Sequence, residues 1–271
     1  MKILVFGKDG QLGRAFQDEW HHQELSNENQ ICFVGRSECD LFDPLQLDKL
    51  LNDYAPDCII NAAAYTAVDK AETEANLAFA INATAPELMA KYSSNHGGTF
   101  LHFSTDYVFD GTKPTPYNED DVPNPQSVYG ASKLAGEQAM GDGDAIVRIS
   151  WVCGYHGANM VKTILKLGAT MPELKFVNDQ IGNPTFADDA ARAIVNIATS
   201  GEGGIWHVTN QGAVSWYEFA RDVLRVAGMD AEKVKPIAAS LKESIALTKP
   251  LKSRLRWLIT NSEKKQRALS A

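Results

Sequence analysis

A tyrosine and a lysine lie four residues apart in the stretch YGASK, residues 129–133. On an α-helix, residues four apart share one face and lie one turn from each other. An isolated phenol has a pKa of about 10, and a nearby ammonium favours the phenolate and so lowers that pKa towards the working pH. The spacing therefore predicts a general acid, Tyr129, whose acidity is set by Lys133. Alone, the same spacing more often indicates an ordinary exposed helix.

A second polar stretch precedes this pair, at the end of a predicted strand. Residues 101–103 have the apolar pattern of a buried strand, so Ser104 and Thr105 fall at its carboxyl end. In open α/β sheets, ligands bind at the carboxyl ends of the strands. We therefore expect a hydroxyl at this edge to help Tyr129 hold a substrate oxygen.

The first residues of the chain predict a phosphate-binding turn. A short apolar run at residues 2–6 is followed by GKDGQLG at 7–13 and by a helical pattern over 12–20. Glycines let a backbone approach an anion, and a helix N-terminus offers N–H groups and the positive end of its dipole. The spacing is Gly-x-x-Gly-x-x-Gly rather than the commoner Gly-x-Gly-x-x-Gly. At the end of the first strand, it favours a bound dinucleotide over a plain loop.

The end of the second predicted strand, residues 31–34, bears on the choice of cofactor. An acidic residue at this place usually holds the ribose 2′-hydroxyl of NAD, whereas an arginine accommodates the 2′-phosphate of NADP. Here the strand is followed by Gly35, Arg36 and Ser37, which favours NADP, and Glu38 keeps NAD open. Asp40 and Leu41 flank an adenine or lie in a solvated loop.

A third predicted strand, residues 58–60, ends in the small residues of NAAAYT at 61–66. Small side chains at a strand tip let a ligand lie against the backbone, and a run of alanines is also compatible with tight helix packing. A single helix is predicted over residues 72–92, with the polar Asn82 in its middle. Residues 110–125 are rich in Pro, Asp, Gly and Asn and therefore predict a loop.

Strands and helices alternate along residues 1–154, which predicts an α/β fold with a doubly wound, Rossmann-like parallel sheet. Beyond residue 154 the pattern loosens. We expect residues 155–271 to form mainly a smaller substrate-binding lobe, with some segments returning to the first domain. Asp43 before Pro44 predicts one helix start, and Ser215 with Glu218 predicts a capping box at another.

The bulk composition excludes several kinds of partner. The 271 residues are 44% hydrophobic, with a net charge of −8 and a sequence pI of about 5.3. The absence of a basic run argues against nucleic acid or an anionic membrane surface as partner. The amino-terminal apolar run is too short for a signal peptide, and no stretch has the length of a membrane span. We expect a soluble protein of the reducing cytoplasm.

The cysteines and histidines show no pattern typical of a metal site. The four cysteines form no Cys-x-x-Cys pair, and the histidines do not combine with cysteines or carboxylates at ligand spacing. His102 and His207 fall in strand-like runs, where buried, hydrogen-bonded histidines are expected. No metal is predicted.

Six motifs together resemble the extended short-chain dehydrogenase/reductases, in particular members that reduce nucleotide-linked 4-keto sugars. They are GKDGQLG at 7–13, NAAAYTAVDKAE at 61–72, HFSTDYVFDG at 102–111, YGASK at 129–133, RISW at 148–151 and VNDQIGNPT at 177–185.

The resemblance implies a mechanism and a set of site residues. A nicotinamide would deliver hydride to the C4 ketone of a nucleotide sugar, and Tyr129 would give its proton to the developing alkoxide. Lys133 would lower the tyrosine pKa and hold the nicotinamide ribose, while Thr105 would hydrogen-bond the same oxygen. NADPH is the expected cofactor, with NADH possible. The cofactor residues implied are Gly7, Gly10, Gln11, Leu12, Arg36, Ser37, Asp40, Leu41, Ala62, Ala63, Ala64, Tyr65, Tyr129 and Lys133; those for substrate are Thr66, Val68, Thr105, Tyr107, Tyr129, Trp151 and Asn183.

Related activities remain alternatives. Nucleotide-sugar dehydratases carry Thr-Asp-Glu where this chain has Tyr107 as the third residue, which disfavours elimination. The chain also resembles the non-catalytic, NADP-binding regulatory subunit of methionine adenosyltransferase, although the complete Thr–Tyr–Lys set argues against that reading. A reductase of a different nucleotide-linked 4-keto sugar is a further alternative.

Two departures from the family pattern limit what is carried over. The family's Arg-Pro near the carboxyl end appears here as Lys249-Pro250, which keeps a charge but loses the bidentate fork. The glutamates of a metal-bridged dimer are replaced by Ala15 and Asp188. We therefore expect a monomer or a weak homodimer without a bridging metal.

Overall fold

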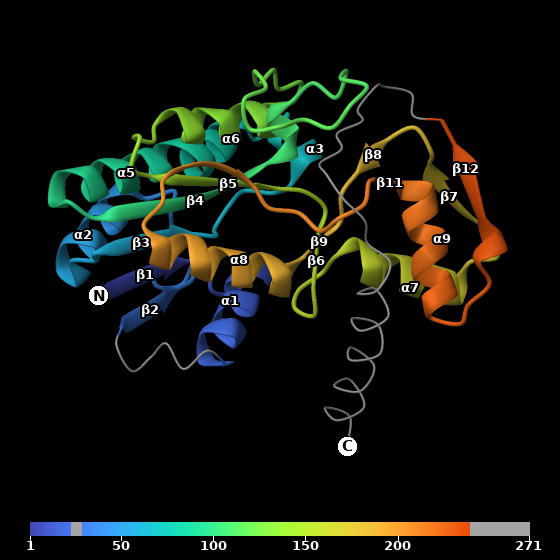
Figure 1. Ribbon diagram of the computed structural model, residues 1–271, viewed down its shortest axis with the longest axis horizontal. Helices are drawn as coiled ribbons and strands as arrows, with labels where there is room; N and C mark the ends of the chain where they lie inside the picture. The colour runs from blue at the N-terminus through green and yellow to red at the C-terminus, as the bar shows by residue number, and fades with distance from the viewer. Residues whose placement is uncertain (23–28, 239–271) are drawn as a thin grey trace. The chain divides into compact units, whose positions relative to one another are not determined.

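The computed structural model describes residues 1–22 and 29–238, and the chain divides into two compact units (Figure 1). Among the described residues, the first unit contains 1–22, 29–109, 119–149 and 188–208. The second contains 110–118, 150–187 and 209–238. Residues 188–208 therefore belong to the same unit as the amino-terminal strands.

The first unit is built on a six-stranded sheet with the order β10-β5-β4-β3-β1-β2. All five neighbouring pairs run parallel. Because β2 lies on one side of β1 and β3 on the other, the strand order reverses at β1 and creates a switch point between β1 and β3. The doubly wound parallel sheet is confirmed. Its strands are β1 Lys2–Phe6, β2 Gln30–Val34, β3 Cys58–Asn61, β4 Thr99–Thr105, β5 Ala145–Ile149 and β10 Gly204–His207.

Helices cover both faces of this sheet. In Figure 1, α5 (Ala85–His96) and α6 (Val128–Gln138) lie above β4 and β5, and α1 (Gln11–His22) and α8 (Ala187–Ser200) lie below these two strands. Because both faces are covered, β3 is buried along its whole length. One core cluster joins the strands to α5 and to α2 (Pro44–Tyr54). The predicted start of α2 is confirmed, because Asp43 accepts hydrogen bonds from the N–H groups of Leu45 and Gln46.

The single helix predicted over residues 72–92 was wrong in detail. The structure has α3 (Val68–Ala71), α4 (Ala75–Phe79), a π-helical turn (Ala80–Thr84) and then α5. The π-turn contains Asn82, whose side chain is fully buried and hydrogen-bonded to other segments. A π-turn re-aims the side chains of a helix, and such turns are frequent at functional sites.

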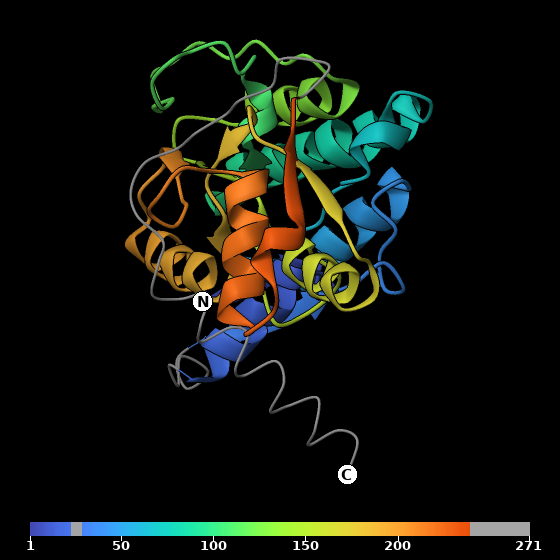
Figure 2. The ribbon, with the colours of Figure 1, turned by 90° about the vertical axis from the view of Figure 1, so that its right-hand side faces the viewer.

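In its described residues, the second unit has three small two-stranded pairs and the α-helices α7 (Met160–Thr170) and α9 (Trp216–Val226). Its core lies between α7 and α9, and Figure 2 shows α9 beside β12. The capping box predicted at Ser215 and Glu218 is confirmed at the start of α9. The pairs are β7 Leu174–Val177 with β12 Val234–Ile237, β6 Val152–Cys153 with β9 Thr185–Phe186, and β8 Ile181–Gly182 with β11 Val214–Ser215.

Within the part of the chain that the structure describes, none of the helices combines the length and apolar content that a bilayer crossing requires. The same residues hold no group of three or more His, Cys, Asp or Glu side chains placed to bind a metal ion.

Candidate active site

The glycine turn between β1 and α1 lies at the switch point of the sheet. Gly7 has a φ of 89°, which L side chains rarely adopt, and a Cβ there would lie 2.6 Å from the Ala63 nitrogen. A Cβ on Gly13 would lie 2.1 Å from the Gly7 carbonyl oxygen. The turn is therefore packed against both α1 and the residues after β3, and only glycine fits. This cradle, which ends at the N-terminus of α1, fits the pyrophosphate of a dinucleotide.

The residues that follow β3 are held in place by two buried asparagines. Asn61 accepts a hydrogen bond from the Ala63 N–H at 3.1 Å through its Oδ1. Asn82 accepts from the Tyr65 N–H at 2.9 Å and donates to the Tyr65 carbonyl oxygen at 3.0 Å. The stretch 62–65 is therefore fixed on both sides, next to the glycine turn.

Charged residues gather at the end of β2. Glu38 pairs with Lys8 of the glycine turn and accepts from the Gly35 N–H, and these contacts lower the pKa of Glu38 to about 2. Arg36 lies in the same turn, with its side chain 77% exposed and 3.3 Å from Asp40. The carboxylate that kept NAD open in the sequence is therefore neutralised by a lysine, while the arginine faces solvent.

The predicted acid and its hydroxyl partner meet where β4 ends. Thr105 donates to Asp106 Oδ1 at 2.9 Å and accepts from the Tyr107 N–H at 3.2 Å, and its hydroxyl lies near enough to the Tyr129 phenol to lower the pKa of that phenol. Helix α6 rests directly on this strand end, because a Cβ on Gly130 would lie 2.2 Å from the Tyr107 carbonyl oxygen. The Tyr107 and Tyr129 rings contact edge to face at 5.6 Å. The structure therefore brings three predicted site residues, Thr105, Tyr107 and Tyr129, into one cluster.

The electrostatics of this cluster differ from the sequence-based expectation. Burial raises the pKa of Tyr129 above its usual range, the Thr105 hydroxyl opposes that rise, and the nearby Asp106 carboxylate adds to it. The Lys133 Nζ lies against His102, and its predicted effect on the pKa of Tyr129 stays a prediction. The phenol is therefore held in its protonated form at neutral pH.

Lys133 lies in the interior of the first unit, 1% exposed on the buried face of α6. Its Nζ is 2.9 Å from His102 Nε2. Burial lowers the pKa of Lys133 to about 7, and the Glu137 carboxylate one turn further along α6 opposes this shift. Lys133 is therefore poised to change its charge near neutral pH.

Two predicted substrate residues, Trp151 and Asn183, belong to the second unit. Trp151 has a φ of 45°, unusual for a non-glycine residue, and its ring stacks on Trp216 with centroids 3.5 Å apart. Asn183 is buried, its carbonyl oxygen accepts from Ser150 Oγ at 2.6 Å, and its Nδ2 donates to the Asn210 carbonyl oxygen at 3.3 Å. Each is firmly held within its own unit. Lys249 lies outside the described residues.

Several residues that support the site were not among the site residues predicted from the sequence. Asn61, Asn82 and His102 hold the residues after β3 and the buried face of α6. Glu137 and Arg148 form a buried ion pair beside them. The one sequence signal for these residues is a polar side chain in an otherwise apolar stretch.

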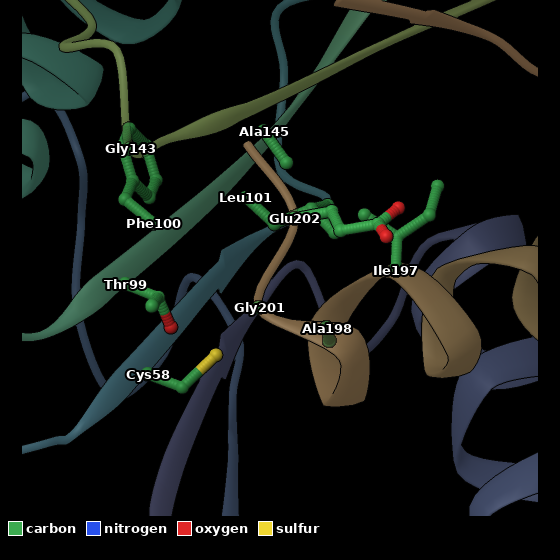
Figure 3. A pocket seen from close by; sticks show the side chains of 10 residues that line it. All are labelled: Cys58, Thr99, Phe100, Leu101, Gly143, Ala145, Ile197, Ala198, Gly201 and Glu202. Carbon is green, nitrogen blue, oxygen red and sulfur yellow. The ribbon is translucent and has the colours of Figure 1, made fainter. Parts of the chain in front are cut away.

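A hollow at the opposite edge of the sheet has no comparable chemistry. Figure 3 shows it beside Cys58, Thr99 and Ala145, which begin β3, β4 and β5. Burial raises the pKa of the Cys58 thiol, which disfavours the reactive thiolate. The glycine turn after β1 and Thr105 at the end of β4 lie instead at the carboxyl edge of the sheet.

A doubly wound parallel sheet, a glycine turn at its switch point and a buried Thr–Tyr–Lys set define a dinucleotide-binding protein of the extended short-chain dehydrogenase/reductase class. Comparison with known proteins gives the family. The chain belongs to the RmlD substrate binding domain family, which matches residues 1–267.

Named relatives cover most of the chain. A dTDP-4-dehydrorhamnose reductase from Sinorhizobium fredii is 41% identical over 236 residues, which span 83% of this chain and 78% of that protein. The crystal structure of a dTDP-4-dehydrorhamnose reductase from Clostridium acetobutylicum matches with a TM-score of 0.90 and 36% identity, over 97% of this chain and 100% of that one. That of a dTDP-4-dehydrorhamnose reductase from Bacillus anthracis, in complex with NADP, matches with a TM-score of 0.87 and 34% identity, over 96% and 98%.

Proposed function

We propose that this protein is an NADPH-dependent reductase that converts dTDP-4-dehydro-L-rhamnose to dTDP-L-rhamnose. The observation that carries the proposal is the Tyr129 phenol, buried beside Thr105 at the carboxyl edge of the sheet. The names of the relatives supply the substrate, and the NADP complex of the Bacillus anthracis protein supports the cofactor.

In this proposal the first unit binds NADPH, which when bound supplies the hydride for the C4 ketone. The turn with Gly7 and Gly10, followed by Gln11 and Leu12 of α1, holds the pyrophosphate. Arg36 and Ser37 take the 2′-phosphate. Glu38, the carboxylate next to Ser37, is paired with Lys8, and the exposed Arg36 side chain can turn from Asp40 to the phosphate. Asp40 and Leu41 flank the adenine, and residues 62–65 line the path towards the nicotinamide.

Tyr129 is the general acid. Its raised pKa keeps the phenol protonated at neutral pH, so a proton is available for the ketone oxygen as the hydride arrives at the carbon. Thr105 hydrogen-bonds the same oxygen and fixes its position. The phenolate left on Tyr129 is stabilised by Lys133 in its ammonium form, which also holds the nicotinamide ribose.

This role of Lys133 gives the activity a pH dependence of definite sign. The ammonium is present below the lysine pKa of about 7 and is lost above it. The rate of reduction therefore falls as the pH rises through that value, while the phenol stays protonated throughout.

On the first unit, the residues proposed to contact the sugar are Thr66, Val68 and Tyr107. Trp151 and Asn183, also predicted from the sequence to contact the substrate, belong to the second unit. Trp151 offers a rigid aromatic face, since it stacks on Trp216.

The test is the consumption of NADPH by the purified protein, followed by the absorbance of the reduced nicotinamide. Consumption should require dTDP-4-dehydrorhamnose, should not occur with a dTDP-hexose that lacks a ketone, and should yield dTDP-rhamnose. Tyr129→Phe should lower kcat by about 10²–10⁴-fold. Tyr92→Phe, a control at another buried tyrosine, should retain activity.

NADPH binding without turnover of any nucleotide-linked keto sugar would defeat the proposal and favour a non-catalytic NADP-binding subunit. Turnover of a different 4-keto sugar alone would reassign the substrate but keep the chemistry.

A further inference from the structure

Lys133 is the end of a chain of three buried polar side chains inside the first unit. Its Nζ lies 2.9 Å from His102 Nε2, and the opposite ring nitrogen, Nδ1, lies 3.2 Å from Asn61 Nδ2. Asn61 and His102 are fully buried, and Lys133 is 1% exposed. A chain of hydrogen bonds between side chains therefore connects the strands β3 and β4 with helix α6.

The hydrogen bonds of Asn61 select one form of the histidine. Asn61 Oδ1 already accepts from the Ala63 N–H at 3.1 Å, so the amide nitrogen must face the ring. An amide nitrogen has only N–H groups to offer, and His102 Nδ1 must therefore accept. A neutral imidazole that accepts at Nδ1 carries its proton on Nε2.

This tautomer determines which protonation state of Lys133 fits the contact with His102. The Nε2–H of His102 points at the lysine nitrogen, which can accept it only as a neutral amine, because an ammonium has no lone pair. For the ammonium to donate to Nε2, the ring proton would have to move to Nδ1. The proton on Nδ1 would then face the N–H of Asn61. This clash would be avoided only if the Asn61 amide rotated and lost its hydrogen bond with the Ala63 N–H.

The surroundings keep water away from the pair. A Cβ on Gly136 would lie 3.4 Å from His102 Nε2 and 2.2 Å from the Asn82 carbonyl oxygen, so α6 packs closely over the ring. Burial and the neighbouring Lys133 both hold the pKa of His102 well below its usual range, which leaves the ring neutral.

Several other groups around the pair are polar or ionisable. On α6, Tyr129 lies one turn before Lys133 and Glu137 one turn after it. Glu137 favours the ammonium, but it is also hydrogen-bonded to Arg148 of β5 through both oxygens. Its charge is therefore largely compensated, and the direct contact of Lys133 is with His102.

We propose that His102, fixed in one tautomer by Asn61, is a positioning residue that favours the neutral amine of Lys133 and thereby sets the upper pH limit of the enzyme. The effect on the upper pH limit of the activity rests on the proposed function of Lys133. The tautomer of His102 and the titration of Lys133 do not depend on that function.

Asn61→Asp tests the selection of the tautomer. One carboxylate oxygen can still accept from the Ala63 N–H, and the other can accept from a proton on His102 Nδ1. The ring proton then leaves Nε2, which becomes an acceptor for the Lys133 ammonium. Because a hydrogen bond to a charged group is gained, the lysine titration should move up by about one pH unit or more.

NMR of the purified protein gives the direct readout. The chemical shifts of the His102 ring nitrogens are assigned by their loss in His102→Gln. At neutral pH they should show the proton on Nε2 in the unmodified protein. In Asn61→Asp they should show it on Nδ1. The Lys133 side-chain titration should move upward in both variants. His96→Gln, a control at an exposed histidine, should change neither. A proton on Nδ1 of the unmodified protein, or an unmoved lysine titration, would overturn the proposal.

The rate of NADPH oxidation against pH gives the second readout. The upper pH limit of kcat should move up by about one unit in Asn61→Asp and in His102→Gln, since Gln offers an oxygen to the ammonium. Loss of activity at all pH values with an unchanged limit would indicate a structural role and contradict the proposal. If the unmodified protein reduces no keto sugar, the proposed function fails and the NMR titration still decides on the tautomer.

Discussion

Replacing Glu137 by glutamine should destabilise the first unit strongly, because it leaves a buried arginine without its counter-charge. The two side chains are 2% and 3% exposed, and Glu137 accepts from Arg148 Nε at 3.0 Å and from Nη2 at 2.7 Å. Removing one partner of a buried pair costs about 3–5 kcal/mol, most of it the penalty of an uncompensated charge. Glutamine keeps the shape but can offer only one oxygen to the guanidinium.

The assay is urea unfolding followed by tryptophan fluorescence, with the free energy of unfolding taken from the midpoint and slope. Asp222→Asn is the matched control, since it breaks a more exposed carboxylate–arginine pair with Arg225 and should cost less than about 1 kcal/mol. The double variant Glu137→Leu with Arg148→Met should cost less than Glu137→Gln alone, because no buried charge is left unpaired.

The same substitution has a second, independent consequence for Lys133. Glu137 raises the pKa of Lys133, so its removal lowers that pKa further. The rate of reduction should then begin to fall at a lower pH than in the unmodified protein. A loss of stability no larger than that of Asp222→Asn would refute the reasoning about the buried pair, and an unchanged pH limit would refute the link to the lysine.

Two further predictions concern the cofactor. Gly13→Ala should lower NADPH affinity roughly ten- to hundredfold, the cost of about one hydrogen bond to a charged phosphate, because its Cβ would lie 2.1 Å from the Gly7 oxygen. Gly143→Ala, where a Cβ meets nothing within 4 Å, should leave affinity unchanged, and equal effects would contradict the cradle. Arg36→Ala should weaken NADPH roughly ten- to hundredfold and NADH much less in fluorescence titrations, whereas equal loss for both would contradict the 2′-phosphate assignment.

The features that the sequence predicted well are those that depend on neighbours along the chain. The apolar run at β1, the glycines after it and the cap at Asp43 each follow from a few consecutive residues. The same holds for Ser215 and Glu218, whose capping box is a contact between residues three apart. In these places the local pattern and the fold agree.

The features that the sequence did not predict depend on contacts between distant segments. Residues 77–88 have an apolar spacing that suits one helix, and the π-turn arises because Asn82 bonds to Tyr65 and Ser132, 17 and 50 residues away. Lys133 was expected to act on Tyr129, four residues away, but its nitrogen contacts His102 of another element. The close packing of α6 at Gly136 makes that contact possible, and helical spacing does not reveal it.

The measurement that tests the central claim most directly follows the hydride itself. The protein is given NADPH deuterated at the reactive carbon of the nicotinamide together with dTDP-4-dehydrorhamnose, and the product is analysed by NMR and mass spectrometry. The account predicts dTDP-rhamnose with deuterium at C4, and very slow formation of the same product with Tyr129→Phe. An unlabelled product, or a sugar that stays unreduced while the cofactor is bound, would contradict it.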